Sequence, residues 1–188
     1  KDAKDAGEKL PDPKAHKECK YRDCWRNAIF LEDFCWEHLP AEKKTTYKRK
    51  IEKWAGAKRS FKKANLTEAD LQEADLTTAN FQKADLSHTK FRGACLLGAN
   101  LQEANLVGVD LQEANLIGAN LNRTHLHWAN LKGSLLEHAQ LKEAYFRGTL
   151  LDGAFNLTWN QIEKVREESE QHWKDAREDY CNLKNYFH

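Results

Sequence analysis

The chain has 188 residues, which is enough for one or two domains. Its 30 lysines and arginines nearly balance its 29 aspartates and glutamates, so the net charge favours neither nucleic acid nor a membrane surface as a partner. No apolar run approaches the roughly 18 residues of a membrane-spanning helix. No signal peptide is visible, although the chain begins with Lys1 and not with Met. We therefore expect a cytoplasmic protein.

We expect residues 1–18 to be a flexible segment. The residues that follow it include a cluster of side chains that can bind a metal ion. Thiol and imidazole groups stand within twenty positions of one another, at Cys19, Cys24, Cys35 and His38. Zinc prefers four such ligands in a tetrahedron, and a C-x2-H pair lets one turn supply two of them. Residues 19–40 resemble the short Cys3His knuckle sites of many bacterial proteins, which implies a structural Zn2+ ion. Free buried thiols, a disulfide in an exported protein, and His16 as a substitute ligand are the alternatives.

The next segment predicts a basic helix over residues 41–58. Tyr47, Ile51 and Trp54 are spaced by four and three, so they form one apolar stripe that should cover the start of the following segment. The basic side chains are expected to face water; they are Lys43, Lys44, Lys48, Arg49, Lys50 and Lys53. The alternative is a basic patch that contacts phosphate groups of nucleic acid or of anionic lipids.

From residue 61 to residue 154 the sequence repeats every five residues. The large position holds Leu or Phe in nineteen consecutive repeats, and the small position three residues later holds only Ala, Thr, Val or Ser. Helices have a period of 3.6 residues and strands a period of 2, so neither explains a period of five. We infer that each repeat sends two side chains inward and three outward and then turns a corner. Four corners close a square coil of about twenty residues.

Stacked coils would pair their backbones as a parallel sheet does, at a spacing of about 4.8 Å. Leu and Phe would fill the interior, and Asn or Asp before them, such as Asn65 and Asp70, would suit a corner. Nineteen repeats make about 4.7 coils and a length of roughly 23 Å. The A(D/N)LXX pattern is similar to that of the pentapeptide repeat family. This resemblance implies a mainly β fold, a right-handed quadrilateral parallel β-helix over residues 60–155.

Outward positions of the later repeats are apolar or aromatic where those of the earlier repeats are polar. Leu97 and Ile117 are twenty residues apart, so they should stand one above the other on one face. An exposed apolar column needs a cover, either from the C-terminal segment or from a partner. The predicted interaction surface comprises Leu97, Val107, Ile117, His127, Trp128 and Tyr145. A candidate patch for contact with a small molecule or a metal ion comprises His125, His127, Trp128 and Tyr145. The simpler explanation is that these side chains bind a neighbouring helix.

A long amphipathic helix is predicted over residues 159–188. Its apolar side chains recur at spacings of three and four, from Ile162 and Val165 to Phe187. This helix should cap the last coil, mediate self-association or bind a protein partner. The final stretch AREDYCNLKNYFH resembles a segment that precedes an ion-channel-like membrane region in some larger pentapeptide repeat proteins. That resemblance implies the soluble part of a membrane-tethered protein, with membrane contact only beyond residue 188.

No catalytic motif is present in the sequence, so we expect no enzyme and no small-molecule substrate. The predicted function is a non-enzymatic protein-interaction or scaffold module. Some members of the pentapeptide repeat family confer quinolone resistance by imitating duplex DNA. The first alternative is therefore that this chain is a DNA-mimic modulator of a type II topoisomerase (DNA gyrase). Such mimicry needs a strongly acidic surface, whereas residues 61–154 hold eleven acidic and nine basic side chains. The second alternative is nucleic-acid binding through the basic helix and the zinc knuckle, with a steep salt dependence.

Overall fold

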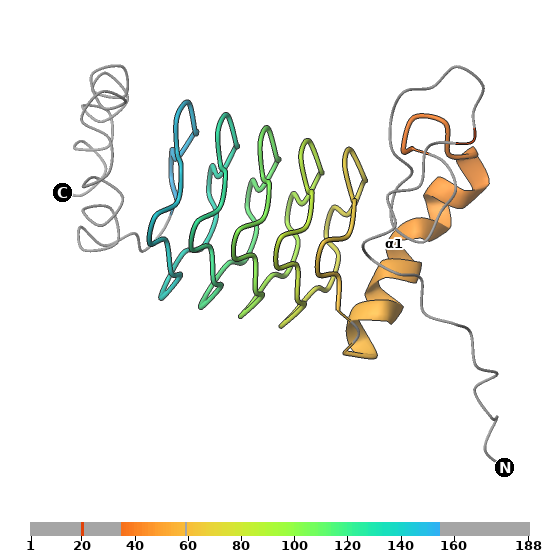
Figure 1. The fold of residues 1–188 in the computed structure, drawn as a ribbon, viewed down its shortest axis with the longest axis horizontal. Helices are drawn as coiled ribbons and strands as arrows, with labels where there is room; N and C mark the ends of the chain where they lie inside the picture. The colour runs from red at the N-terminus through yellow and green to blue at the C-terminus, as the bar shows by residue number, and fades with distance from the viewer. Residues whose placement is uncertain (1–19, 21–34, 59, 155–188) are drawn as a thin grey trace, which may run out of the picture.

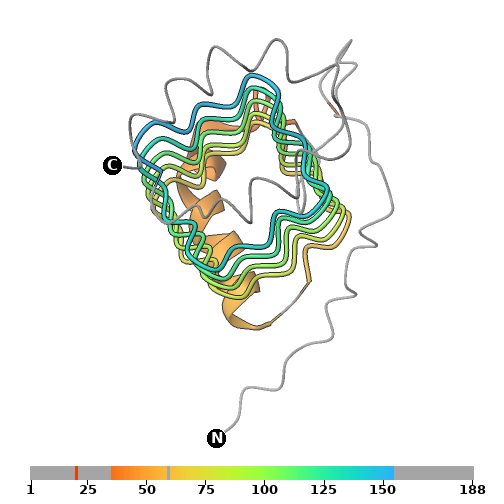
Figure 2. The ribbon, with the colours of Figure 1, turned by 90° about the vertical axis from the view of Figure 1, so that its left-hand side faces the viewer.

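The computed structural model describes residue 20, residues 35–58 and residues 60–154. Within these residues, helix α1 (Ala41–Gly56) lies against the N-terminal end of a stack of coils (Figure 1). Seen along the stack, the successive coils follow one four-sided outline (Figure 2). The predicted four-sided parallel coil is therefore confirmed. Residues 1–18, Cys19, Cys24 and the predicted helix over residues 159–188 lie outside the described residues.

A tight turn forms each corner of the coil. In the first repeat the Ala64 N–H donates to the Phe61 carbonyl oxygen at 2.9 Å, which closes a four-residue turn. The second central residue of all nineteen turns has a left-handed φ, as in type II turns; twelve of these residues are not glycine, including Lys63 at 61°. That conformation costs about 1–2 kcal/mol per residue outside glycine. The stack compensates because the N–H of such residues bonds to the next coil, as Lys63 does to Gln82 at 3.0 Å.

The corner is therefore made by the two residues that follow the large position, and not by the Asn or Asp for which the sequence predicts that place. Asn65 lies on a flat side, where it forms a parallel β-bridge with Asp85. Its side chain still serves the turn, because Asn65 Oδ1 accepts the Thr67 N–H at 3.1 Å. A side-chain oxygen just before a turn can reach the first N–H of that turn, which explains the preference for Asn and Asp at this position.

The coils stack in a fixed register of twenty residues. Each of the fourteen β-bridges joins a residue to the residue twenty positions later, such as Asn105 to His125. A typical rung has the Asp85 N–H donating to the Ala64 oxygen at 2.9 Å and the Leu66 N–H donating to the Asp85 oxygen at 2.7 Å. Consecutive turns leave one bridging residue on each flat side. The expected mainly β class is therefore present as single bridges, while α1 is the one regular helix among the described residues.

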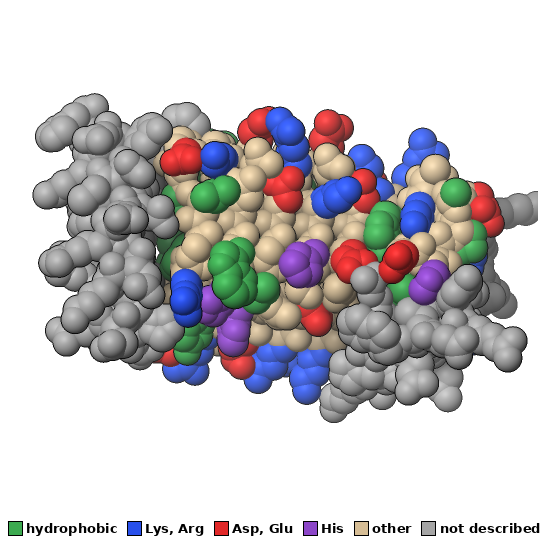
Figure 3. Space-filling model, turned by 90° about the horizontal axis from the view of Figure 1, so that it is seen from above, with side chains coloured by type: hydrophobic (Ala, Val, Ile, Leu, Met, Phe, Trp, Pro, Cys, Tyr) green, Lys and Arg blue, Asp and Glu red, His purple; other side chains and the backbone are tan. Residues whose placement is uncertain are grey.

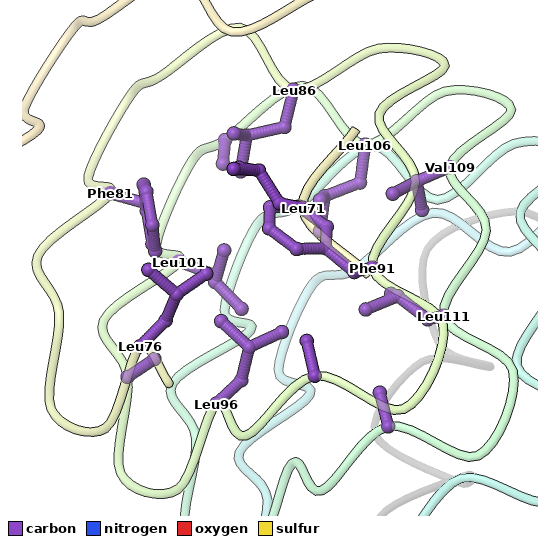
Figure 4. Close-up of a cluster of buried hydrophobic side chains, with 14 of the residues drawn as sticks. Leu71, Leu76, Phe81, Leu86, Phe91, Leu96, Leu101, Leu106, Val109 and Leu111 are labelled. Atoms are coloured by element: carbon purple, nitrogen blue, oxygen red, sulfur yellow. The ribbon is translucent and has the colours of Figure 1, made fainter. Parts of the chain in front are cut away.

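The interior is filled by the large and small positions, whose side chains converge from all four sides (Figure 4). Leu71, Leu101 and Phe91 have no exposed surface. Phe61 and Phe81, twenty residues apart, stack with ring centroids 4.7 Å apart, as the predicted columns require. The polar exceptions at the small position are satisfied; Thr89 Oγ1, for example, donates to the Leu66 carbonyl at 2.7 Å.

Helix α1 covers the first coil with both apolar and charged side chains. Tyr47 and Ile51 are buried in the same cluster as the coil interior. Lys48 Nζ donates to the Gln72 carbonyl oxygen at 3.1 Å, and Glu52 Oε1 accepts the Asp75 N–H at 3.1 Å. The first coil has no coil before it to pair these groups, so the helix supplies their partners and blocks an edge that could pair with another chain.

The helix ends at Gly56, two residues before the predicted boundary. A turn follows in which the Lys58 N–H donates to the Ala55 oxygen at 2.7 Å and Lys58 has a φ of 54°. This left-handed residue redirects the chain into the first repeat. The apolar stripe is less uniform than its spacing suggests, because Trp54 is only half-buried and its Nε1 donates to the Ser60 oxygen at 3.5 Å.

Candidate interaction and metal sites

The predicted interaction surface does not form one surface. One coil has twenty residues and four edges, so residues ten positions apart lie on opposite edges of the stack. Leu97 and Val107 are related in this way, and so are Ile117 and His127. Leu97 is 40% exposed, whereas Ile117 and Val107 are half-buried. Leu97 and Ile117 therefore lie on one edge of the stack, away from Val107, His127, Trp128 and Tyr145.

His127 and Trp128, on the edge opposite Leu97, come together with two residues of the adjoining flat side, and we call these four residues the aromatic–histidine patch: His125, His127, Trp128 and Tyr145. Ring centroids are 5.0 Å apart for His125 and Tyr145, and 5.9 Å apart for His127 and Tyr145, which stack with an interplanar angle of 15°. Trp128 lies 6.1 Å from His127 and is 64% exposed, and Tyr145 is 49% exposed. Figure 3 shows hydrophobic and histidine side chains gathered near the C-terminal end of the stack.

The coil register explains how these rings meet. His125 bridges to Tyr145 of the next coil, so the two side chains leave the same flat side one coil apart. His127 and Trp128 are the two central residues of the turn that follows His125, and Trp128 has the left-handed φ of that position, 56°. Pentapeptide periodicity thus places three consecutive outward positions and one position of the next coil in a single cluster.

Gly148 belongs to this arrangement, although the sequence reasoning did not single it out. A Cβ atom at Gly148 would lie 2.5 Å from Trp128 Cδ1 and 2.9 Å from Trp128 Nε1, so the indole ring rests over this glycine. The same relation recurs two coils earlier, where a Cβ at Gly108 would lie 2.6 Å from His88 Nδ1. The signal that could have revealed both pairs is a glycine twenty residues after an outward ring.

The predicted basic patch is only partly directed to solvent. Lys43, Arg49, Lys50 and Lys53 are exposed, as expected. Lys44 and Lys48 are half-buried and contact the protein instead. Lys44 Nζ lies 5.5 Å from the Trp36 ring centroid and donates to the Glu37 carbonyl at 3.2 Å. Lys48 bonds to the first coil, which removes it from any phosphate-binding face.

Two of the four predicted zinc ligands lie in the described residues, and they are adjacent. Cys35 is 3% exposed, and its Sγ is 3.3 Å from His38 Nδ1. Zinc bound tetrahedrally at about 2.3 Å from sulfur and 2.0 Å from nitrogen would hold these two atoms about 3.5 Å apart. The described residues contain no group of three or more His, Cys, Asp or Glu side chains arranged to hold a metal ion. Cys19 and Cys24 fall outside them.

Ion pairs link successive coils along the edges of the stack. Lys83 and Glu103 are 3.0 Å apart, and Lys132 and Asp152 are also 3.0 Å apart. Arg92 pairs with Glu113 at 2.8 Å, and Arg123 pairs with Glu143. The hydrogen bond from Arg123 lowers the pKa of Glu143 below its usual value. These four carboxylates of the repeats, Glu103, Glu113, Glu143 and Asp152, are thus matched by basic side chains from the neighbouring coil.

The chain belongs to the pentapeptide repeats family, whose model describes eight copies of the repeat and matches residues 60–98, 94–133 and 129–159. Members of this family form right-handed β-helices. No sequence among the curated proteins matches. No helix in the described part of the chain has the length and apolar character needed to cross a bilayer.

Solved structures of three pentapeptide repeat proteins are similar to this chain. One, from the thylakoid lumen of Arabidopsis thaliana, is 31% identical, with a TM-score of 0.49 and coverage of 54% of this chain and 73% of that one. Rfr23 of the cyanobacterium Cyanothece 51142 is 39% identical, with a TM-score of 0.36 and coverage of 47% and 57%. HetL of Nostoc, involved in heterocyst differentiation regulation, is 29% identical, with a TM-score of 0.33 and coverage of 52% and 51%. This chain thus spans about half the length of Rfr23 and HetL.

Proposed function

We propose that this chain is a non-enzymatic protein-interaction or scaffold module that presents the aromatic–histidine patch to a protein partner. The exposure of two large aromatic side chains, 64% for Trp128 and 49% for Tyr145, carries this proposal. Tyr and Trp are enriched at protein interfaces because each combines a large apolar surface with a polar group. The coil below them is filled with buried side chains, so the patch is held on a rigid support.

The filled interior argues against catalysis. Enzymes and small-molecule sites use concave pockets lined by a few convergent polar groups. Here the inward side chains of the coils, such as Leu96 and Leu106, are fully buried against one another. The flat sides carry Asn and Asp whose oxygens accept turn N–H groups, as Asn120 Oδ1 does from Asn122 at 3.1 Å. These groups are engaged in holding the coil.

The DNA-mimic alternative, in which the chain would bind DNA gyrase, is less well supported. A mimic of duplex DNA must present unpaired negative charge, because DNA carries one charge per about 1.7 Å of its axis. In this chain, four carboxylates of the repeats pair with lysines or arginines, as Glu103 does with Lys83, and the nine basic side chains of residues 61–154 nearly cancel the eleven acidic ones. Nucleic-acid binding by the basic helix is weakened in a similar way, since Lys44 and Lys48 contact the protein.

We propose that the N-terminal region holds one structural Zn2+ ion. The ligands would be Cys19, Cys24, Cys35 and His38, and the separation of 3.3 Å between Cys35 Sγ and His38 Nδ1 supports this assignment. Four protein ligands would leave no open position, so the ion would stabilise the fold and take no part in a reaction. Metal analysis of the purified protein should find one zinc per chain, and Cys35→Ser should abolish it. Wild-type protein without zinc after purification under reducing conditions would contradict the proposal.

The interaction proposal is tested by comparing variants on the two opposite edges. Full-length protein is crosslinked in lysate of its own source, and the partners recovered are compared for wild type, Trp128→Ala and Leu97→Ala. Loss of one specific partner with Trp128→Ala alone supports the patch. Equal recovery by all three proteins would contradict it. A supercoiling assay with DNA gyrase supplies the second arm, in which inhibition would favour the DNA-mimic alternative.

We also propose that residues 159–188 mediate self-association or bind a protein partner, and that the protein is cytoplasmic or the cytoplasmic part of a membrane-tethered protein. The spacing of the apolar residues Ile162, Val165 and Phe187 supports a helix with one apolar face, which could pack against another protein surface. Light scattering after size exclusion, on the full chain and on a chain ending at residue 158, distinguishes a dimer from a monomer. Fractionation of cells with an antibody to the repeats tests the location.

A further inference from the structure

Two histidines of the aromatic–histidine patch share the geometry of a chelating pair. His125 and His127 are separated by the inward Leu126, so both imidazoles leave the same side of the coil. Their ring centroids are 6.1 Å apart, with an interplanar angle of 60°. His125 is exposed and His127 is half-buried.

We propose that His125 and His127 form a binding site for a divalent transition-metal ion with a preference for imidazole, such as Ni2+ or Cu2+. Each ring would use one nitrogen, and the other nitrogen would remain for a hydrogen bond, as is usual for histidine ligands. Two imidazoles on one ion, at a metal–nitrogen distance of about 2.1 Å and an angle of 90–109°, have centroids about 4.5–5.3 Å apart. Binding would require the exposed His125 side chain to rotate and bring the ring centroids closer than the observed 6.1 Å.

The surroundings favour an ion with open coordination positions. Tyr145 flanks both imidazoles, with centroid separations of 5.0 and 5.9 Å, and restricts the rotamers that they can adopt. Trp128 flanks His127 on the other side at 6.1 Å. Water would complete the coordination sphere, because the protein offers two nitrogens. This pattern suits tetragonal Cu2+ and Ni2+ better than the closed four-ligand arrangement of structural zinc.

The position of Trp128 gives the proposal its own spectroscopic readout. A paramagnetic ion bound between His125 and His127 would lie within several ångströms of the Trp128 indole and would quench its fluorescence. Trp128 is one of six tryptophans in the chain, so only part of the emission should be lost. Trp128→Phe should therefore remove the quenching and leave the heat of binding in place.

The experiment takes full-length protein that was loaded with zinc and then freed of weakly bound zinc by dialysis, and titrates it with Ni2+ by calorimetry and by tryptophan fluorescence. The zinc that remains occupies thiolate groups, which prefer that ion to Ni2+ in a cysteine-rich site. Single variants His125→Asn and His127→Asn should each weaken Ni2+ binding by about tenfold or more. His138→Asn, an exposed histidine on another edge, is the matched control and should not change the affinity.

Asn is chosen because it already occupies these positions elsewhere in the stack: Asn105 stands one coil before His125, and Asn122 holds the same place in its repeat as His127. Both variants should therefore keep the fold, as circular dichroism will verify. The proposal is supported when only the two patch variants lose affinity and Trp128→Phe loses only the quenching. It is overturned when the wild type binds no more tightly than the His125→Asn variant, or when His138→Asn weakens binding as much. It is also overturned when tight Ni2+ binding leaves tryptophan emission unchanged.

Discussion

Replacing Gly148 by Ala should displace the Trp128 ring without altering any residue of the aromatic–histidine patch. The new Cβ would lie 2.5 Å from Trp128 Cδ1 and 2.9 Å from its Nε1, which is closer than such atoms can approach. The indole must therefore leave its position over the glycine. Gly118 occupies the same turn position with a similar φ, 65° against 70°, and nothing lies within 4 Å of its would-be Cβ. Gly118→Ala is the matched control.

The expected loss of stability separates into two parts. Both substitutions place a non-glycine residue at a left-handed φ, which should cost about 1 kcal/mol, the lower end of the usual range, because twelve non-glycine residues already hold this conformation in the stack. Gly148→Ala adds the cost of forcing the Trp128 side chain from its rotamer, about 0.5–1.5 kcal/mol. We therefore expect a loss of about 1.5–2.5 kcal/mol for Gly148→Ala and about 1 kcal/mol for Gly118→Ala.

Urea unfolding followed by far-UV circular dichroism measures these losses. A double-mutant cycle with Trp128→Ala isolates the contact, because Ala at position 148 should cost no more than Ala at position 118 once the ring is removed. Gly108→Ala repeats the test under His88. Equal losses for Gly148→Ala and Gly118→Ala, together with zero coupling in the cycle, would refute the conclusion that Gly148 seats the indole ring.

Three further predictions concern the coil itself. Phe81→Ala should lower the free energy of unfolding by about 3–5 kcal/mol in urea titrations. Phe81→Leu should cost under about 1.5 kcal/mol, because Leu fills fifteen of the nineteen large positions. Similar losses for both variants would contradict the conclusion that the Phe81 side chain fills the interior. Glu52→Ala should cost about 0.5–1.5 kcal/mol, the usual net contribution of a hydrogen bond, because the exposed Asp75 N–H exchanges its protein acceptor for water. It should also promote oligomers in size-exclusion chromatography, while Glu42→Ala on the exposed start of the helix should do neither. The side-chain and backbone hydrogen bonds of Thr77 lower the pKa of Asp75, so the stability that they provide is present above the ordinary pKa of an aspartate and is lost as the pH falls through the lowered value. An NMR titration should show that Thr77→Val raises the pKa of Asp75 towards its ordinary value, and an unchanged pKa would be the contrary result.

The sequence by itself determined the coil. A period of five with one large and one small residue is incompatible with both regular secondary structures, and four repeats close a square whose interior those residues fill. Local chemistry determined the turns as well, because Asn65 and its equivalents accept the N–H of the following turn. The same pattern could not locate the corner, since an Asn before a turn and an Asn within one look alike in a sequence. The pattern also gave no indication that each flat side of the coil has only one bridging residue, so that the sides form single bridges and not extended strands.

The tertiary structure decided which outward residues meet. The register of twenty residues places Tyr145 against His125 and sets Leu97 and Val107 on opposite edges, so the predicted interaction surface is divided. Helix amphipathicity predicted that α1 would cover the first coil through its apolar stripe. It gave no indication that Lys48 and Glu52 pair the free backbone groups of that coil. These contacts depend on the exact placement of the helix on the coil, which arises from packing between segments about twenty residues apart and not from any local preference.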